Sequence, residues 1–429
     1  MEVKILSAHY SNPEYRSIEG YKRLGGYEIL AKALKMEPQK IIDEVKAAGL
    51  RGRGGAGFPT GTKWGFLPKN NEPRYLLCNA DESEPGTFKD RLMMERAPHQ
   101  LIESMIISSF ALNVKKSYIY IRGEYTGPAA ILEKALKEAY AAGYLGKNIL
   151  GSGFDLELDL YIGAGAYICG EETGMISSLE GLKGQPKLKP PFPAVSGYLK
   201  KPTIVNNVET LASVIHILRD GVATYRKFGT EKSPGTKLFS LSGDVNKPGT
   251  YEVPLGYPLK DFIEKECGGL KAGRKLKAVI PGGSSAPVLT AEEAYKATLD
   301  YECLAQMGTM LGSGAIIVID DSNCMVDILS TITHFYHHES CGQCTPCREG
   351  TGWLNKLVHS VITGDAQPKD LDLLIQVADN MKGRTICALS DAAALPVLSF
   401  VKKFRSEFDY FVANKKSQVK GQIYAQMHH

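Results

Sequence analysis

The sequence has no apolar run of about 18 residues, the length that a membrane-spanning helix needs. Its first ten residues also lack the basic and apolar stretches of a secretory signal peptide. Neither positive nor negative side chains are in large excess, because 51 basic and 47 acidic side chains leave a formal net charge of only +4. We therefore expect a cytoplasmic chain that does not span a membrane, and the charge favours no particular class of partner.

Cysteine spacing of the disulfide type is also absent. Of nine cysteines, five lie singly in apolar or mixed segments, which is typical of a reducing compartment. These five are Cys78, Cys169, Cys267, Cys303 and Cys324. The length of 429 residues and a 43% share of hydrophobic residues predict a globular protein of roughly two to four domains. The closing pair His428 and His429 resembles a purification remnant.

Hydrophobic periodicity divides the chain into stretches of different texture. Helical spacing over 27–48 is stopped by Gly49 and followed by a glycine-rich loop. From 74 to about 229, strands alternate with helices, which predicts a mainly parallel α/β sheet. Short strands and Pro-Gly turns from 237 onward indicate a small β-rich domain, and helical spacing from 325 onward indicates an all-α end. Strands are expected at 75–78, 118–121 and 156–162, and helices at 100–112, 129–142, 259–267, 328–337, 354–362, 371–381 and 392–405.

A run of three cysteines separated by two residues each carries the strongest chemical signal. Two-residue gaps let thiolates converge on the corners of one iron–sulfur cubane, whose fourth cysteine comes from elsewhere in the fold. The fourth candidate follows 40 positions after the third. The predicted ligands are Cys341, Cys344, Cys347 and Cys387.

Zinc is the alternative metal for this run. Structural zinc sites usually pair C-x₂₋₄-C with a second such pair or with two histidines, and no second cysteine pair is present. His337 and His338 lie close enough in sequence to be ligands, although four thiols already suffice. The spacing therefore favours the iron–sulfur cluster.

The glycine-rich loop 51–64 contains G-x-G-x-x-G at Gly52, Gly54 and Gly57. The dinucleotide fingerprint requires a strand before these letters and a helix after them, whereas here a helix precedes the loop and Phe-Pro-Thr-Gly follows. A purely structural loop is one interpretation. The density of glycines together with Arg, Lys and Thr favours a bound phosphate or flavin ring.

Four further segments are candidates for ligand contact. The acidic turn 79–87 follows a predicted strand, where open α/β sheets bind ligands, although acidic turns are often only solvated. The segment 163–174 repeats this arrangement, with two acids that would also complement a helix dipole. The basic, proline-rich loop 187–193 is either a cleft wall or a plain connector, and 206–210 either caps a helix at 211–218 or holds a phosphate there.

Together these segments closely resemble the NADH-binding flavoprotein subunit of the respiratory NADH:quinone oxidoreductase, complex I. The resemblance covers nearly the whole chain and rests on 52–64, 79–87, 163–174, 206–210 and 339–350, in that order. It implies the α/β fold class, with a Rossmann-like flavin domain, a ubiquitin-like β-grasp insert and a C-terminal helical bundle that carries an iron–sulfur cluster. The implied boundaries are 1–60 for an N-terminal helical and Gly-rich segment, 61–229 for the FMN/NADH domain, 230–322 for the β-grasp domain, 323–420 for the bundle and 421–429 for a tail.

The resemblance also implies the residues that hold the cofactors. For FMN they are Gly52, Gly54, Lys63, Asn79, Asp81, Glu82, Ser83, Glu84, Tyr167, Gly170, Glu171, Glu172, Val205, Asn206, Asn207 and Thr210. Around NADH they are Phe58, Phe66, Glu84, Glu172, Lys189 and Phe192. One 4Fe–4S cluster is then held by Cys341, Cys344, Cys347 and Cys387.

The implied activity is that of an NADH dehydrogenase, which accepts a hydride from NADH onto FMN and passes electrons singly to the cluster on the way to quinone. We expect Glu84 and Glu172 to set the preference for NADH, because carboxylates near a ribose repel the extra phosphate of NADPH. The implied partners are a small thioredoxin-like 2Fe–2S subunit and a larger iron–sulfur subunit of the hydrophilic arm, on the inner face of the cell membrane.

Two other functions are compatible with these motifs. One is the diaphorase subunit of an NAD-linked hydrogenase or formate dehydrogenase, which shares the motifs but often carries extra cysteine-rich segments. The other is a zinc-stabilised nucleotide-binding module without redox activity, which would be colourless.

Overall fold

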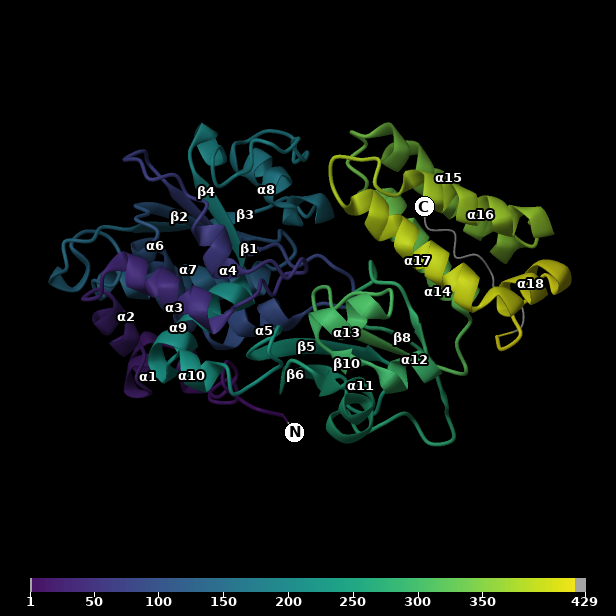
Figure 1. Ribbon diagram of the computed structural model, residues 1–429, viewed down its shortest axis with the longest axis horizontal. Helices are drawn as coiled ribbons and strands as arrows, with labels where there is room; N and C mark the ends of the chain where they lie inside the picture. The colour runs from purple at the N-terminus through teal and green to yellow at the C-terminus, as the bar shows by residue number, and fades with distance from the viewer. Residues whose placement is uncertain (1, 421–429) are drawn as a thin grey trace.

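The computed structural model describes residues 2–420 in three groups of elements (Figure 1). We call them the α/β part, the β-rich part and the helical bundle. The expected tail 421–429, with His428 and His429, lies outside the described residues. No helix within residues 2–420 is both long enough and apolar enough to cross a membrane.

The α/β part is built on a four-stranded sheet in the order β3-β2-β1-β4, with every neighbouring pair parallel. This confirms the mainly parallel sheet predicted from the alternation of strands and helices. Its elements are η1 (Pro13–Arg16), α1 (Ile18–Arg23), α2 (Glu28–Ala33), α3 (Pro38–Ala48), α4 (Thr60–Trp64), β1 (Tyr75–Ala80), α5 (Lys89–Arg96), α6 (Pro98–Ala111), β2 (Lys116–Ile121), α7 (Thr126–Ala141), η2 (Ile149–Gly151), β3 (Glu157–Ile162), η3 (Tyr167–Gly170), α8 (Glu172–Leu179), η4 (Tyr198–Lys200), β4 (Thr203–Asn207), α9 (Val208–Asp220) and α10 (Val222–Tyr225).

At the inner strand β1 both faces of this sheet are buried, and successive residues of β1 show it. Leu76 and Cys78 belong to one core with helices α6, α7 and α9, whereas Leu77 belongs to a second core with α8 and the helical bundle. The pleat directs neighbouring side chains to opposite faces, so a strand covered on both sides must be apolar almost throughout. The run Tyr75-Leu76-Leu77-Cys78 meets this demand.

Local signals explain where several helices start and stop. Gly49 ends α3 with φ 69°, the left-handed conformation that suits glycine. The expected continuous helix over 27–48 is instead two helices, because Pro38 starts a new one at α3. The helix expected at 211–218 starts earlier, at Val208, because the side chain of Asn207 accepts a hydrogen bond from Glu209 N at 3.0 Å and caps it.

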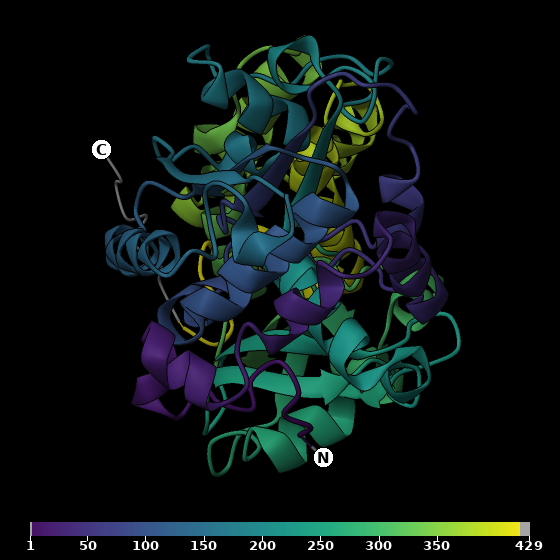
Figure 2. The same cartoon turned by 90° about the vertical axis from the view of Figure 1, so that its left-hand side faces the viewer.

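The β-rich part holds a five-stranded mixed sheet in the order β6-β5-β11-β8-β9 and a separate pair β10-β7. It encloses its own core, which includes Phe239, Phe262 and Val318. The first described residues lie beside it, since Val3 N donates to Glu252 O at 2.9 Å. Figures 1 and 2 show this N-terminal segment next to the β-rich part. Its elements are β5 (Thr236–Gly243), β6 (Gly249–Pro254), β7 (Tyr257–Pro258), α11 (Leu259–Asp261), the π-helical turn η5 (Phe262–Glu266), β8 (Leu276–Ile280), β9 (Leu289–Thr290), α12 (Ala291–Lys296), β10 (Thr298–Leu299), α13 (Tyr301–Gln306) and β11 (Ala315–Asp320).

The helical bundle consists of α14 (Met325–Glu339), α15 (Thr345–Thr363), α16 (Pro368–Met381), α17 (Leu389–Lys403) and α18 (Arg405–Asn414). The final helix expected at 392–405 is therefore wrong at its end, since the chain turns at Phe404 and continues as α18. The three-cysteine run joins α14 to α15. Cys347 lies in the first turn of α15, because Pro346 is well suited to start a helix.

Candidate functional site

A cavity of about 450 Å³ lies where the α/β part, the β-rich part and the helical bundle meet. Its size is that of a small-molecule site. The carboxyl ends of β1 and β4 open into it, which is where open α/β sheets bind ligands. Eleven of the predicted site residues line it: Gly54, Asn79, Asp81, Glu82, Ser83, Glu84, Tyr167, Gly170, Glu171, Asn207 and Cys387.

The glycine-rich loop forms one wall through Gly54, Gly55 and Ala56. A Cβ on Gly54 would stand 2.9 Å from the Cβ of Asn207, so the close approach of loop and strand end requires glycine there. Within residues 2–420, the backbone N–H groups of these three wall residues have no hydrogen-bond partner. Unpaired N–H groups beside a cavity are suited to an anion such as a phosphate.

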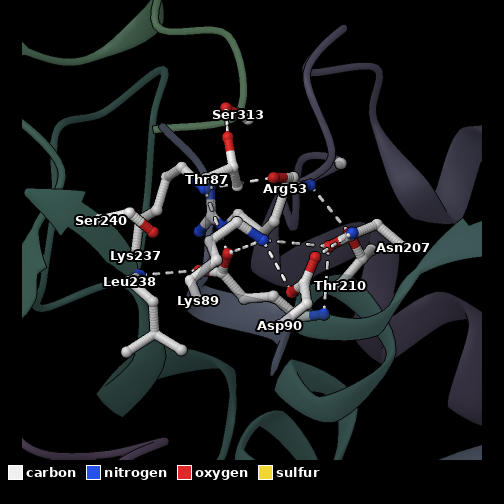
Figure 3. A network of polar contacts seen from close by, with 12 residues as sticks. Arg53, Thr87, Lys89, Asp90, Asn207, Thr210, Lys237, Leu238, Ser240 and Ser313 are labelled. Carbon is white, nitrogen blue, oxygen red and sulfur yellow. Dashed lines mark hydrogen bonds and ion pairs between the residues drawn. The ribbon is translucent and has the colours of Figure 1, made fainter. Parts of the chain in front are cut away.

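A buried network of charges lies behind this wall (Figure 3). Lys89 contacts Asp90 and Glu209, each at 2.8 Å, and Lys237 contacts Glu209 at 3.1 Å. Asn207 Nδ2 donates to Asp90 at 2.7 Å. Burial alone would raise the pKa of Glu209, but the charges of Lys237, Lys89 and Arg53 outweigh it and hold the pKa to about 2.

Asp81 and Glu82 follow β1 and are buried at the cavity. Burial raises the pKa of both carboxyls to about 7. Glu82 accepts from Asp90 N, Arg91 N and the Tyr125 hydroxyl. Asp81 differs, because its Oδ2 has no partner among the described residues and stands close to Gly170 on the cavity wall. A buried oxygen without a partner needs one, and a ligand hydroxyl or N–H would supply it.

Glu84 is held by donors on both of its oxygens. Tyr167 OH donates at 2.7 Å to one, and Ser285 N and Oγ donate at 2.8 and 2.7 Å to the other. Burial raises the pKa of Glu84, and these hydrogen bonds limit the rise. Its carboxylate therefore also joins the acidic turn to the β-rich part.

Alternating charges lie beside the cavity. Lys63 contacts Glu172 at 2.8 Å, and Lys189 contacts Glu172 and Glu171, each at 2.9 Å. Burial would raise the pKa of Glu172, but the two lysines outweigh it and lower the pKa. Glu171 also caps α8 by accepting from Thr173 N and Gly174 N.

Several residues predicted to hold FMN do not line the cavity but support its walls. Lys63 also donates to Val205 O at 3.0 Å, Asn206 accepts from Trp64 Nε1 at 2.8 Å, and Thr210 accepts from Arg53 N at 2.8 Å. Gly52 O accepts from Tyr301 OH at 2.7 Å. The structure thus gives Gly52, Val205, Asn206 and Thr210 a visible role in packing the site.

Three predicted aromatic side chains are exposed. Phe58 is 46% exposed, Phe66 53% and Phe192 57%, and the ring centroids of Phe58 and Phe66 lie 6.0 Å apart. Large exposed rings are candidates for stacking on a planar ligand.

Cys387 belongs both to the cysteine set and to the cavity wall. The four thiols share one hydrophobic cluster of the bundle, in which Cys347 is buried and the other three are half-buried. Burial raises the pKa of Cys387 to about 11. In residues 2–420, no three His, Cys, Asp or Glu side chains meet closely enough to share a single metal ion. A 4Fe–4S cubane does not require the thiolates to meet at a single ion, since its irons hold them at separate corners.

The two alternative histidine ligands are placed differently. His338 is exposed and its Nδ1 contacts Glu339 at 3.0 Å. His337 packs over Gly352, where an added Cβ would stand 3.2 Å from its ring.

Comparison with known proteins gives the family. The chain is 51% identical over 94% of its length to the F 2 subunit of NADH-quinone oxidoreductase of Rhizobium meliloti, covering 96% of that protein. It is 50% identical over 94% of its length to the F subunit of NADH-quinone oxidoreductase of Mycobacterium bovis, covering 92% of it. The chain belongs to the family of NADH-quinone oxidoreductase F subunits.

Family domains match its parts separately. The Nuo51 FMN-binding domain matches residues 45–216, the SLBB domain 237–319, and the iron–sulfur binding region of NADH-ubiquinone oxidoreductase F 327–410. A solved NAD+-reducing NiFe-hydrogenase in its H₂-reduced state is 37% identical with a TM-score of 0.81, covering 96% of this chain. The chain spans 65% of the length of that hydrogenase chain. The predicted fold class is confirmed.

Much of the wall in this member of the family could not be found from sequence motifs. The β-rich part adds Gly282, Ser285, Met310, Gly312 and Ser313, and the start of α17 adds Ala388, Leu389, Asp391, Ala392 and Leu395. Lys89 and Asp90, at the start of α5, extend the wall beyond the acidic turn. The turn 281–285 gives no such signal, because its glycines and serines look like those of any loop until the fold brings Ser285 to Glu84.

Proposed function

We propose that this chain is the NADH-oxidising subunit of a complex I, with FMN in the cavity and a 4Fe–4S cluster on the bundle. The chemistry that FMN supplies when bound is acceptance of a hydride from NADH and release of the two electrons, one at a time, to the cluster. The observation that carries the proposal is Cys387, because one predicted cluster ligand lies in the wall of the predicted flavin cavity. That arrangement suits electron transfer from one cofactor to the other.

The residues present fit FMN. The unpaired N–H groups of Gly54, Gly55 and Ala56 suit its phosphate, and the free oxygen of Asp81 suits a polar group of the flavin or its ribityl chain. We assign the remaining cavity contacts to Asn79, Glu82, Ser83, Tyr167, Gly170, Glu171 and Asn207. Gly52, Lys63, Val205, Asn206 and Thr210 support them from behind.

We propose that NADH binds at the edge of the cavity. Phe58, Phe66 and Phe192 offer exposed rings to the planar groups of the dinucleotide, and Glu172 with Lys189 offers charges to its ribose and phosphates. We propose that Glu84 contacts the dinucleotide from a fixed position, because Tyr167 and Ser285 hold its carboxylate by hydrogen bonds. No side chain is required as a nucleophile, and these residues bind and orient.

For the cluster we propose Cys341, Cys344, Cys347 and Cys387. In the complex, the partners are a small thioredoxin-like 2Fe–2S subunit and the larger iron–sulfur subunit of the hydrophilic arm. The chain would then lie at the inner face of the cell membrane as a peripheral subunit.

The second candidate is the diaphorase subunit of an NAD-linked hydrogenase or formate dehydrogenase, favoured by the similarity to the NAD+-reducing hydrogenase. The identities argue for complex I, because this chain is 51% identical to the Rhizobium meliloti relative and 37% identical to the hydrogenase chain.

The test is an anaerobic visible spectrum of the purified chain, with iron and flavin quantified, before and after one addition of NADH. We expect flavin bleaching and about four irons per chain. A colourless chain that contains zinc would overturn the redox function and return the site to the zinc-stabilised module.

A further inference from the structure

The β-rich part contacts the glycine-rich loop at the face opposite the cavity. Tyr301 OH donates to Gly52 O at 2.7 Å, and Lys237 Nζ donates to Arg53 O at 3.1 Å. Tyr301 starts α13 and Lys237 lies on β5, so both donors come from the β-rich part and both acceptors from the loop. Two successive carbonyl groups of the loop are thereby turned away from the cavity.

Packing strengthens this hold. Arg51 Cζ lies 3.9 Å from the centre of the Tyr301 ring, and Arg51 also contacts Glu302 and donates to Gly57 O at 2.8 Å. A Cβ on Gly57 would stand 2.5 Å from the Tyr301 ring. The loop therefore lies directly on Tyr301, and a residue larger than glycine would not fit.

Lys237 is fixed in turn by the buried network of Figure 3. Its side chain is fully buried and contacts Glu209, which also binds Lys89 and accepts from Leu238 N at 2.8 Å. Lys89 lines the cavity. An unbroken series of contacts thus joins the β-rich part to the cavity wall from behind, while Arg53 N donates to Thr210 of α9.

The free N–H groups of Gly54, Gly55 and Ala56 follow directly after the two carbonyls that are held. Successive peptide units share a backbone, so fixing the carbonyls of residues 52 and 53 restricts where the next N–H groups point. We propose that Tyr301 and Lys237 are positioning residues for the phosphate of the flavin cofactor, acting through the glycine-rich loop. This rests on the proposed function, and it assigns to the β-rich part a role in cofactor binding.

The test compares FMN with riboflavin, which lacks the phosphate. The full-length chain is freed of flavin and titrated with each, with quenching of flavin fluorescence as the readout. Loss of one neutral hydrogen bond in Tyr301→Phe should weaken FMN binding about two- to tenfold and leave riboflavin binding unchanged. Lys237→Met should weaken FMN binding about tenfold or more, because it also leaves Glu209 with one cation fewer.

The matched control is Tyr251→Phe. Tyr251 lies in the same part and also donates its hydroxyl to a backbone carbonyl, that of Lys247, at 2.8 Å, away from the cavity wall. It should bind both flavins as the unchanged chain does. The cluster signal in electron paramagnetic resonance should stay in all three variants.

Three results would overturn the inference: unchanged FMN affinity in Tyr301→Phe, equal weakening of FMN and riboflavin, or the same loss in Tyr251→Phe. If Lys237→Met does not fold, Tyr301→Phe still decides. An unchanged chain that binds neither flavin would overturn the proposed function itself, and the inference with it.

Discussion

The preference for NADH over NADPH can be tested by substitution of Glu172. Its carboxylate is paired with Lys63 and Lys189, so Glu172→Gln removes a negative charge and also frees two cations. Both changes favour the extra phosphate of NADPH, and the ratio of kcat/KM for NADH over NADPH should fall about tenfold, which is about 1.4 kcal/mol. Glu180→Gln, at the end of the same helix, is the control, and an unchanged ratio in Glu172→Gln would remove the claim.

Cys387 tests the cluster. Cys387→Ala should abolish the cluster signal in electron paramagnetic resonance, because a 4Fe–4S cubane needs four thiolates. Flavin should remain bound, since the cavity keeps its other lining groups. Cys303→Ala, also half-buried, serves as control. An intact signal in Cys387→Ala would point to His337 or His338 as the fourth ligand.

Asp81 predicts a pH dependence of stability. Its pKa is raised by burial to about 7 in the folded chain, against about 3.9 when unfolded. A carboxyl with a raised folded pKa binds more protons in the folded state, so stability falls as pH rises from about 4 to 7. Asp81→Asn should remove this fall in stability with rising pH.

The midpoint of thermal unfolding of the flavin-free chain should therefore rise in Asp81→Asn at pH 8 and change little at pH 4. The exposed Asp43→Asn should show no such difference. Equal shifts of Asp81→Asn at both pH values would show that the Asp81 carboxyl does not carry this cost.

At the scale of elements, Glu209 on α9 joins α5 to β5 through Lys89 and Lys237. Glu209→Gln leaves two buried cations without their shared partner, and the free energy of unfolding should fall by roughly 3–5 kcal/mol. Since the pKa of Glu209 is held to about 2, its contribution is present above the unfolded pKa and is lost as pH falls from about 4.3 toward 2.

Urea midpoints measure this loss, with Asp261→Asn as control, because Asp261 pairs with Lys265 at the surface. The control should change the midpoint little. A Glu209→Gln midpoint as high as that of the control would contradict the role given to the network.

Whether a segment forms a helix or a strand was predictable where its hydrophobic pattern was strong, but the residues at which it ends were not. The apolar runs of β1 and β2, the alternating pattern of β3 and the amphipathic helices of the bundle are local signals. The ends of α9 and α17 depend on a side-chain cap at Asn207 and a turn at Phe404, which periodicity does not report. The charged helix α5 has little amphipathic pattern, because its Lys89 and Asp90 are buried in a network that only the fold assembles.

At the scale of the molecule, bound flavin should hold the three parts together. The cavity is lined from all of them, so a ligand that binds only the folded chain raises stability by mass action, by about 2.7 kcal/mol at 100 times Kd. The flavin-free chain should therefore unfold at a lower temperature and be cut faster by protease, and FMN should restore both. Equal unfolding midpoints with and without FMN would show that FMN does not bind the folded chain in preference to the unfolded one.

The candidate site was predictable to the extent that its residues sit in motifs. The glycine-rich loop, the acidic turn and the cysteines each carry a chemical signal in a few neighbouring residues. Gly282, Ser285 and Leu389 carry none, because their place in the wall follows from packing between parts distant in sequence. The boundaries expected at 60, 229 and 322 remain predictions.

The order of the wall along the chain has a consequence for how the protein is made. The cavity needs residues from Gly54 to Leu395, and domains generally fold from the N-terminus as the chain is synthesised. The α/β part can fold early, but its pocket lacks one wall until the β-rich part emerges and another until α17 emerges. If FMN binds in this cavity as proposed, we expect its insertion to be a late event in biosynthesis, and a ribosome stalled before the last helices should carry a folded sheet that does not retain flavin.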